Sequence, residues 1–183
     1  QLGRDTLRAY PDFKRFKHDE DREKDYQIAV EVLKDSRFLP IRVPSDQDRY
    51  NDMIERVMDG AKFVKATMTA TRPDLIALLE EFDLSAADCA TDELAGYVAA
   101  AVKKAIDLWP LTTFDDEIWL PVIWGLGLQR YDYVFLDEGQ DPTLSQLKLA
   151  ISALAPNGRL ITVMDPKQAI YQWRGAAKNV PQH

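Results

Sequence analysis

Acidic residues follow a short apolar run near the end of the chain. The run Tyr133–Leu136 leads directly into Asp137 and Glu138, and Gln140 and Asp141 come just after. Such a run is typical of a buried strand, which delivers polar side chains to the carboxyl edge of a parallel sheet, where α/β proteins bind ligands. Because neighbouring strand side chains point in different directions, one carboxylate can hold Mg²⁺ while the other faces an attacking water. The pattern predicts phosphoryl-transfer chemistry.

A second apolar run, Leu160–Val163, ends just before Asp165. Asp165, Pro166 and Gln168 have the spacing of a helix cap, and a well-formed helix start is one interpretation of them. Two aromatic residues and an arginine follow: Tyr171, Trp173 and Arg174. Aromatic side chains there would stack on bases, a contact worth about 1–3 kcal/mol per base, and the arginine would meet a phosphate or an acid. Packing of the aromatics in a core is the alternative.

The two runs must lie side by side for these residues to act together. A helix is predicted between them, with one apolar face formed by Leu144, Leu147, Ile151 and Leu154. Asn157-Gly158 would then make the return to the second strand. This order predicts a right-handed, parallel βαβ unit and hence an α/β fold at the C-terminal end.

Residues 1–130 are predicted to be almost wholly helical, because apolar residues recur at spacings of three and four. A helix should open at Ser45-x-x-Asp48, a short one should cover Asp74–Phe82, and a third, capped by Thr91, should end at Trp109. The first of these has a predicted core-facing stripe: Tyr50, Met53, Ile54, Val57, Ala61 and Val64.

Charged residues cluster in two places before the acidic loop. The segment Asp12–Lys24 is interpreted as a solvated helix face or mobile arm, with a phosphate-contacting patch as the alternative. Phe114–Trp124 should form a short aromatic-rich helix whose acids lie at its start. Those acids need no function beyond a favourable interaction with the helix dipole, although a functional role stays open.

Composition restricts the class of protein. The 183 residues carry a formal charge of −7, which argues against broad electrostatic adhesion to DNA, so any nucleic-acid contact should be local. Cys89 is the single cysteine, which excludes internal disulfides and multi-cysteine zinc sites and favours a reducing compartment. Neither a membrane span nor a signal peptide is evident, so a cytosolic or nuclear protein is expected. A start at Gln1 and a stop at His183 suggest a fragment.

The two loops together resemble motifs II and III of UvrD/Rep-type superfamily-1 DNA helicases. The first motif is matched by Asp137, Glu138, Gln140 and Asp141; the second is matched from Asp165 to Ala176, with Met164 in place of its initial glycine. Gly139 also departs from the residue usual at its position. Phe114–Pro121 resembles the segment before motif II in phage-like members, and Leu2-Gly3 resembles a remnant of motif Ia.

The resemblance implies a partial RecA-like P-loop NTPase domain with a large, mainly helical insertion. Residues 1–111 would form the insertion, called 1B, and residues 112–183 would form part of the ATPase domain, called 1A. The cofactors would be ATP and Mg²⁺, and the partners would be single-stranded or partly duplex DNA and the rest of the helicase chain. The location implied is the cytoplasm of a bacterium or of a phage-infected host cell.

Each matching residue acquires an expected role from the family. Asp137 would bind Mg²⁺, and Glu138 would be the general base. Gln140 and Asp141 would couple the acidic loop to its neighbours, together with Asp165. Gln168 would sense the γ-phosphate, and Tyr171 and Trp173 would contact single-stranded DNA. Arg174 would link the nucleotide and DNA sites.

The sequence contains no Gly-x-x-x-x-Gly-Lys-Ser/Thr phosphate loop, and motifs IV to VI would lie beyond His183. The 183 residues alone are therefore expected not to hydrolyse ATP. Without the phosphate-loop strand, which flanks the motif III strand in the family, an apolar sheet edge should be exposed. One alternative is a non-catalytic DNA- or protein-binding module with vestigial motor motifs. Another is a metal-dependent nuclease built on Asp137, Glu138, Asp141 and Asp165.

Overall fold

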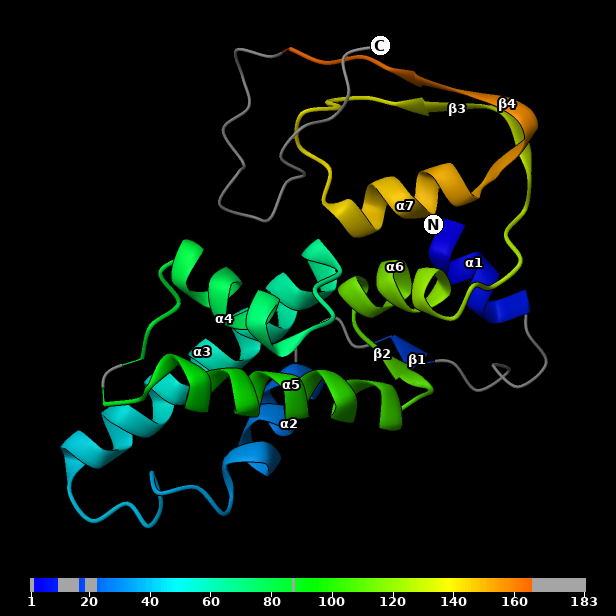
Figure 1. The fold of residues 1–183 in the computed structure, drawn as a ribbon. Coiled ribbons are helices and arrows are strands. Elements are labelled where there is room, and N and C mark those ends of the chain that lie inside the picture. The colour runs from blue at the N-terminus through cyan, green and yellow to red at the C-terminus, as the bar shows by residue number, and fades with distance from the viewer. Residues whose placement is uncertain (1, 10–16, 19–22, 87, 166–183) are drawn as a thin grey trace. The chain divides into compact units, whose positions relative to one another are not determined.

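The computed structural model describes residues 2–9, 17–18, 23–86 and 88–165. Their elements are α1 (Leu2–Ala9), β1 (Lys17–His18), α2 (Glu23–Leu33), α3 (Pro44–Thr67), α4 (Arg72–Glu81), α5 (Thr91–Asp107), β2 (Leu111–Thr112), α6 (Phe114–Ile123), β3 (Tyr131–Leu136), α7 (Leu144–Ser152) and β4 (Leu154–Thr162), as drawn in Figure 1. Within the described ranges, no helix has both the length and the apolar character needed to cross a bilayer.

The chain divides into two compact units. The helical unit comprises Lys17–Val64 and Thr69–Phe114, and the sheet unit comprises Gln1–Phe16, Lys65–Met68 and Asp115–His183. The sheet unit is therefore assembled from three separate stretches of chain. Helix α3 begins in one unit, and its last residues belong to the other.

The helical unit has a core made by apolar stripes at helical spacing. All six residues predicted on one face of α3 are buried, which confirms that stripe: Tyr50, Met53, Ile54, Val57, Ala61 and Val64. Leu75 and Leu79 of α4 and Leu94 and Val98 of α5 belong to the same cluster. Each helix thus buries one face, as the periodicity of the sequence indicates.

Helices α3 and α5 approach each other closely at Gly60. A Cβ atom on this residue would lie 2.6 Å from Cγ2 of Val98, which is too short for carbon atoms in contact. The absence of a side chain at Gly60 is therefore a packing requirement of the helical unit, not a break in α3.

Helix α5 starts differently from the prediction. Its N-cap is Ala90, whose side chain makes no capping hydrogen bond, and Thr91 is the first helical residue, so the predicted Thr91 cap is wrong. Acidic residues in the first turn interact favourably with the helix dipole instead. One of them, Glu93, accepts hydrogen bonds from Arg37 at 3.1 and 3.0 Å, and these bonds lower the pKa of Glu93. The helix ends at Asp107, before the predicted Trp109.

Lys24 contradicts the interpretation of the charged segment as wholly solvated. It is 1% exposed. Its Nζ donates hydrogen bonds to the carbonyl oxygen of Ala105 at 3.0 Å and to that of Leu111 at 2.6 Å. The ammonium thus satisfies one backbone acceptor in the last turn of α5, where the helix dipole favours positive charge, and another in β2. Strands β1 and β2, which the sequence did not predict, pair in parallel in the same unit.

The sheet unit contains the predicted parallel βαβ arrangement. Strand β3 pairs with β4 in parallel, with Phe135 opposite Ile161 and Leu136 opposite Thr162, and α7 connects them. Strand β4 is longer than predicted, because it begins at Leu154 and contains the expected return at Asn157-Gly158. Asn157 has φ 69° there, and the register of the two strands shifts nearby. The predicted turn therefore lies inside β4, as an irregularity in its pairing with β3.

The sequence predicted the wrong buried face for helix α7. Thr143 and Gln146 form a capping box at its start, and the buried helix residues are Ser145 and Leu149. By contrast, Ile151, which was expected to face the core, is 49% exposed. The reason is that Leu149 packs in a small cluster whose other members come mostly from earlier parts of the chain: Leu2, Ile118, Val122, Leu128 and Ala153.

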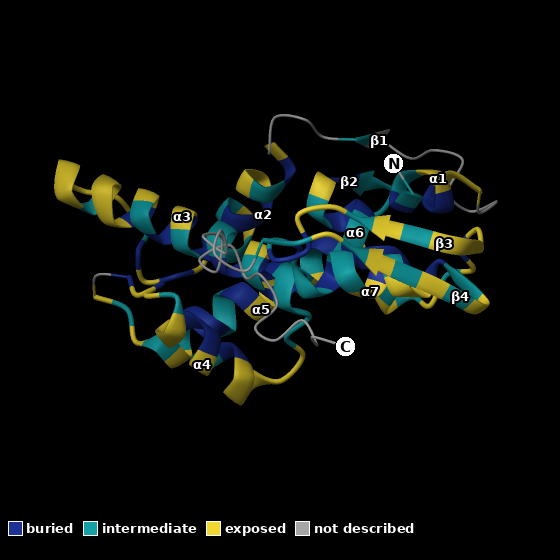
Figure 2. Cartoon of the chain, turned by 90° about the horizontal axis from the view of Figure 1, so that it is seen from above, coloured by how far each residue is buried: buried dark blue, intermediate teal, exposed yellow. Residues whose placement is uncertain are grey.

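Strand β3 is not the buried strand that its composition indicates. Tyr133 is 57% exposed and Phe135 is 72% exposed, and on β4 and just beyond it Ile161 and Val163 are also exposed. These residues alternate along their strands, so they share one face of the sheet. Figure 2 shows the exposed stretches on both strands. A pair of strands with helix α7 packed on it buries too little of this face to shield it from solvent.

Candidate functional site

The loops that follow β3 and β4 meet at the carboxyl end of the sheet. The Val163 amide donates to the carbonyl oxygen of Leu136 at 2.9 Å, and the Gly139 amide donates to the carbonyl oxygen of Val163 at 2.9 Å. Backbone hydrogen bonds therefore continue past the last paired residues of the strands. They hold the acidic loop beside the loop that leads to Asp165.

Glu138 sits in a tight turn with a left-handed backbone. Its φ is 52°, a region that costs most residues other than glycine about 1–2 kcal/mol. Its amide donates to Oδ1 of Asp137 at 3.0 Å, and its carbonyl oxygen accepts from the Asp141 amide at 2.9 Å. The side chains of Asp137 and Glu138 are both exposed. Unusual backbone geometry at a pair of acids is a feature often found at functional sites.

Gln140 joins the two loops through its side chain. It is 8% exposed. Its Nε2 donates to Oε2 of Glu138 at 2.7 Å, and its Oε1 accepts from the Asp165 amide at 3.2 Å. One buried amide group thus orients the carboxylate of Glu138 and fixes the start of the second loop. Removal of this group would leave buried polar atoms without partners, at a cost of about 1–3 kcal/mol.

Asp141 has a buried carboxylate oxygen. Its Oδ1 makes no hydrogen bond within the residues that the structure describes. A buried acceptor of this kind is costly unless a donor or a cation reaches it. Asp141 is therefore the residue of this loop whose environment most favours a further ligand.

Gly139 is required where it stands. A Cβ atom on this residue would lie 2.0 Å from Cγ2 of Thr162, the last residue of β4. Glycine therefore allows the acidic loop to lie directly against the end of the neighbouring strand.

The donor set suits Mg²⁺ bound together with phosphates. Asp137 and Glu138 present exposed carboxylates side by side, and the described residues contain no group of three or more acids, histidines or cysteines that could hold a metal ion. Mg²⁺ typically keeps several waters and binds through one or two carboxylates and the phosphates of a substrate. The residues present fit that mode of binding.

Several predicted site residues lie outside the described part of the chain: Gln168, Tyr171, Trp173 and Arg174. The structure brings together Asp137, Glu138, Gln140, Asp141 and Asp165. Met164, which stands where the motif usually has glycine, is half-buried just before Asp165.

The acids at the start of α6 have partners that the sequence did not reveal. Lys65 Nζ lies 2.8 Å from Oδ1 of Asp116, and the two side chains are 2% and 0% exposed. Arg4 Nε lies 2.9 Å from Oε2 of Glu117. The helix-dipole interpretation omitted both contacts. The partners are distant in sequence, and no local pattern indicates them.

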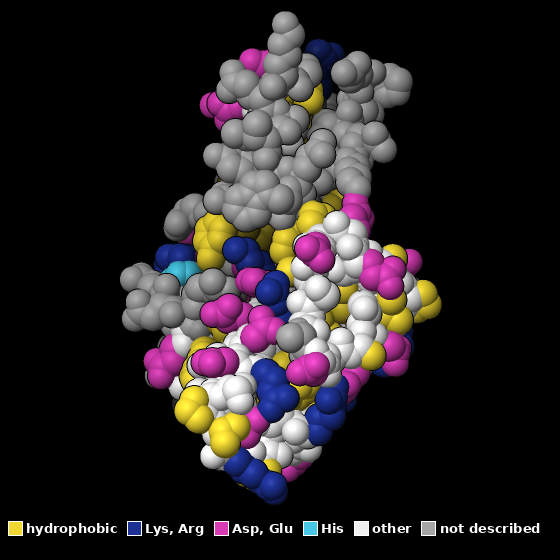
Figure 3. Space-filling view, turned by 90° about the vertical axis from the view of Figure 1, so that its left-hand side faces the viewer, with side chains coloured by type: hydrophobic (Ala, Val, Ile, Leu, Met, Phe, Trp, Pro, Cys, Tyr) yellow, Lys and Arg dark blue, Asp and Glu magenta, His cyan; other side chains and the backbone are white. Residues whose placement is uncertain are grey.

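The visible surface carries mixed charge. On the face drawn in Figure 3, coloured Asp and Glu side chains lie among Lys and Arg side chains and form no continuous basic area. This distribution agrees with the formal charge of −7. It gives no support on that face to broad adhesion of DNA.

Comparison with known families gives one match. The model of the UvrD/REP helicase N-terminal domain matches residues 16–181. This range includes both loops at the carboxyl end of the sheet and the whole of the helical unit. No curated protein matches the chain.

Proposed function

The chain belongs to the UvrD/Rep helicase family, and on that premise we propose that it supplies the acid loop and switch loop of an ATP-driven DNA translocase. The family implies a DNA helicase and ATPase as the activity of the parent protein. The observation that carries the proposal is the Gln140 side chain, which bonds to the Glu138 carboxylate and to the Asp165 amide. Such a bridge suits a site in which ATP hydrolysis at the acidic loop must change the conformation of the loop that starts at Asp165.

The adjacent acids would divide the chemistry between them. Asp137 would hold Mg²⁺, which when bound neutralises charge on the phosphates. Glu138 would accept the proton of the attacking water, and the hydrogen bond from Gln140 would keep its carboxylate oriented. Gln140 is then a positioning residue, and Asp141 would couple the loop to its surroundings through its buried oxygen.

The segment beyond Asp165 would link the nucleotide to DNA. In this proposal Gln168 senses the γ-phosphate, Tyr171 and Trp173 stack on bases of single-stranded DNA, and Arg174 joins the two sites. Support comes from the residue types, because amides and arginine bind phosphates and aromatic rings bind bases.

We assign the helical part, within residues 1–111, to the 1B-like insertion and residues 112–183 to part of the RecA-like domain. The break between units at Phe114 and Asp115 lies near this division, whereas α1 falls in the sheet unit. That position of α1 suits a remnant of motif Ia, which belongs to the RecA-like domain.

The remainder of the helicase would cover the exposed face of β3 and β4. Tyr133, Phe135 and Val163 offer an apolar surface to strands and helices of a larger sheet. The phosphate loop and the second RecA-like domain would come from that remainder, and the whole protein would act on single-stranded or partly duplex DNA in the cytoplasm. Since the 183 residues include no phosphate loop, they should not hydrolyse ATP by themselves.

The test uses the full-length helicase that carries this segment and measures DNA-stimulated ATP hydrolysis. Glu138→Gln should lower kcat by at least about 10²-fold, the usual contribution of a general base, without a matching rise in KM for ATP. Turnover retained in this variant would refute the assignment of the base.

A second variant tests the bridge. Gln140→Leu keeps the size of the side chain but removes both hydrogen bonds, so stimulation by DNA should fall more than the basal rate does. Gln129→Leu, a substitution at an exposed glutamine in the loop before β3, is the matched control. Equal behaviour of the two leucine variants would contradict the role of Gln140.

A further inference from the structure

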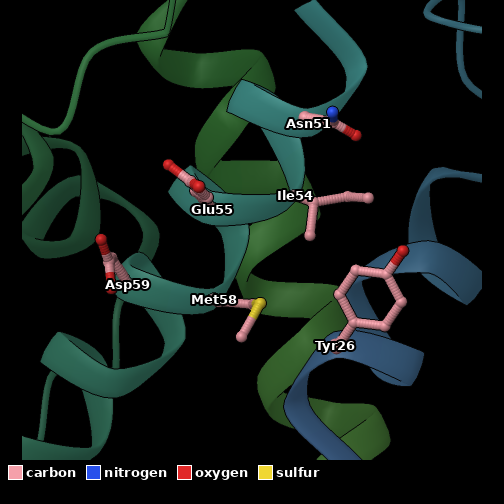
Figure 4. A pocket seen from close by; sticks show the side chains of 6 residues that line it. All are labelled: Tyr26, Asn51, Ile54, Glu55, Met58 and Asp59. Carbon is pink, nitrogen blue, oxygen red and sulfur yellow. The ribbon is translucent and has the colours of Figure 1, made fainter. Parts of the chain in front are cut away.

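A groove lies beside α2 and α3 of the helical unit. It encloses about 470 Å³. Six residues line it: Tyr26, Asn51, Ile54, Glu55, Met58 and Asp59. Figure 4 shows Tyr26 approaching from α2, while the other five side chains belong to successive turns of α3.

One side of the groove is apolar and aromatic. Ile54 is buried at 3% exposure, Met58 is half-buried beside it, and Tyr26 is 51% exposed. In Figure 4 Met58 points towards the ring of Tyr26, and Ile54 points to the same side of α3. An aliphatic chain laid across Ile54 and Met58 would have the Tyr26 ring beside it.

The other side is acidic. Glu55 and Asp59 lie one helical turn apart and project from the flank of α3 away from Tyr26 (Figure 4). Neither carboxylate forms a hydrogen bond or an ion pair within the described part of the chain. The nearby Arg56 does not neutralise them, because its guanidinium is paired with Asp52 at 3.2 Å. Among the residues that the structure describes, the groove lining therefore carries two negative charges and no positive one.

We propose that this groove binds an arginine side chain from a basic segment of a partner protein. The aliphatic stem of arginine suits the apolar side of the groove, where Met58 and the ring of Tyr26 lie, and its planar guanidinium suits the pair of carboxylates on the other side. Lysine fits this site less well than arginine, because its ammonium lacks the planar set of N–H donors that can bind two carboxylates. Nucleic acid is excluded as the occupant by charge, because its phosphates would face Glu55 and Asp59 without a cation between them.

The experiment measures binding of a short fluorescein-labelled peptide of alternating leucine and arginine to the intact 183-residue chain. The same peptide with glutamate in place of arginine is the negative probe. The variant Glu55→Gln/Asp59→Asn removes both charges with little change of shape. Its matched control, Glu80→Gln/Asp107→Asn, removes two exposed acids of the same unit outside the groove. Fluorescence anisotropy gives the affinity, and amide chemical shifts locate the bound peptide.

The groove variant should weaken binding of the arginine peptide by about fivefold, the effect of losing two exposed ion pairs, and the control should not. Tyr26→Leu, which removes the ring at a half-exposed position, should also weaken it. Shift changes should centre on α2 and the middle of α3. Equal losses in the two double variants, equal binding of the glutamate peptide, or shifts elsewhere would overturn the proposal. So would competition by single-stranded DNA for the same residues, or occupation of the groove by a second copy of the chain.

Discussion

Replacement of Lys65 by methionine should destabilise the sheet unit severely. Lys65 and Asp116 are 2% and 0% exposed, and Nζ and Oδ1 lie 2.8 Å apart. Methionine has a similar length but no charge, so it would leave the Asp116 carboxylate buried without its ammonium partner. Loss of one partner of a buried ion pair typically costs about 3–5 kcal/mol of folding free energy, a large share of the 5–15 kcal/mol that stabilises most domains.

Urea unfolding provides the assay, because the denaturation midpoint shifts with the free energy of unfolding. The fluorescence of Trp119, which is 6% exposed on the same helix as Asp116, reports on this unit. An exposed pair serves as the control: Lys34 Nζ lies 2.7 Å from Oε1 of Glu31, but these side chains are 56% and 45% exposed. Lys34→Met should leave the midpoint nearly unchanged, since solvent screens such pairs.

The double variant Lys65→Met/Asp116→Leu separates charge from packing. It removes both ions, so much of the stability lost in the single variant should return. The reasoning would be refuted if Lys65→Met were no more destabilising than Lys34→Met, or if the double variant were no more stable than Lys65→Met alone.

Two further predictions concern Gly139 and Cys89. Gly139→Ala should lower the melting temperature, because its Cβ would lie 2.0 Å from Cγ2 of Thr162; the overpacking costs about 1–3 kcal/mol, and Thr162→Ser should relieve it. A melting temperature equal to that of the unchanged protein would contradict this prediction, because it would mean that the acidic loop moves to accommodate the Cβ atom without cost. Burial, with a smaller contribution from Glu93, raises the pKa of the Cys89 thiol to about 11 from 9.0, so less thiolate is present at neutral pH. Iodoacetamide at about pH 8 should therefore alkylate Cys89 roughly a hundredfold more slowly in the folded protein than in urea; similar rates would contradict the shift.

Local patterns in the sequence predicted the elements that depend on local residues. The stripe from Tyr50 to Val64 is buried as expected, because apolar residues recur there at spacings of about three and four along one helix face. The parallel pairing of β3 and β4 followed from apolar runs separated by one helix. Likewise, the acids at the end of β3 lie beside the loop to Asp165, because parallel strands end at the same edge.

Distant contacts account for the errors. Lys24 was interpreted as part of a solvated or mobile segment, and Lys65 was not singled out at all. Only the folded chain shows that each is buried against partners far away in the sequence. Strand β3 has the composition of a buried strand, yet Phe135 is exposed, since composition does not reveal how many neighbours a strand has. The sequence predicted that Gln140 couples the acidic loop to its neighbours, but not which atoms it bonds to. Its two hydrogen bonds depend on the left-handed turn at Glu138, which the sequence does not reveal.

The discontinuous sheet unit has a consequence for protein engineering. Removing residues 17–114 and joining the flanking segments looks like a clean excision of the helical unit. Such a deletion would also remove Lys65–Met68, which belong to the sheet unit, and would leave Asp116 buried without Lys65. A shortened version would therefore need an apolar residue in place of Asp116. In the intact chain, the stretch between residues 17 and 114 thus contributes a residue to the stability of the sheet unit.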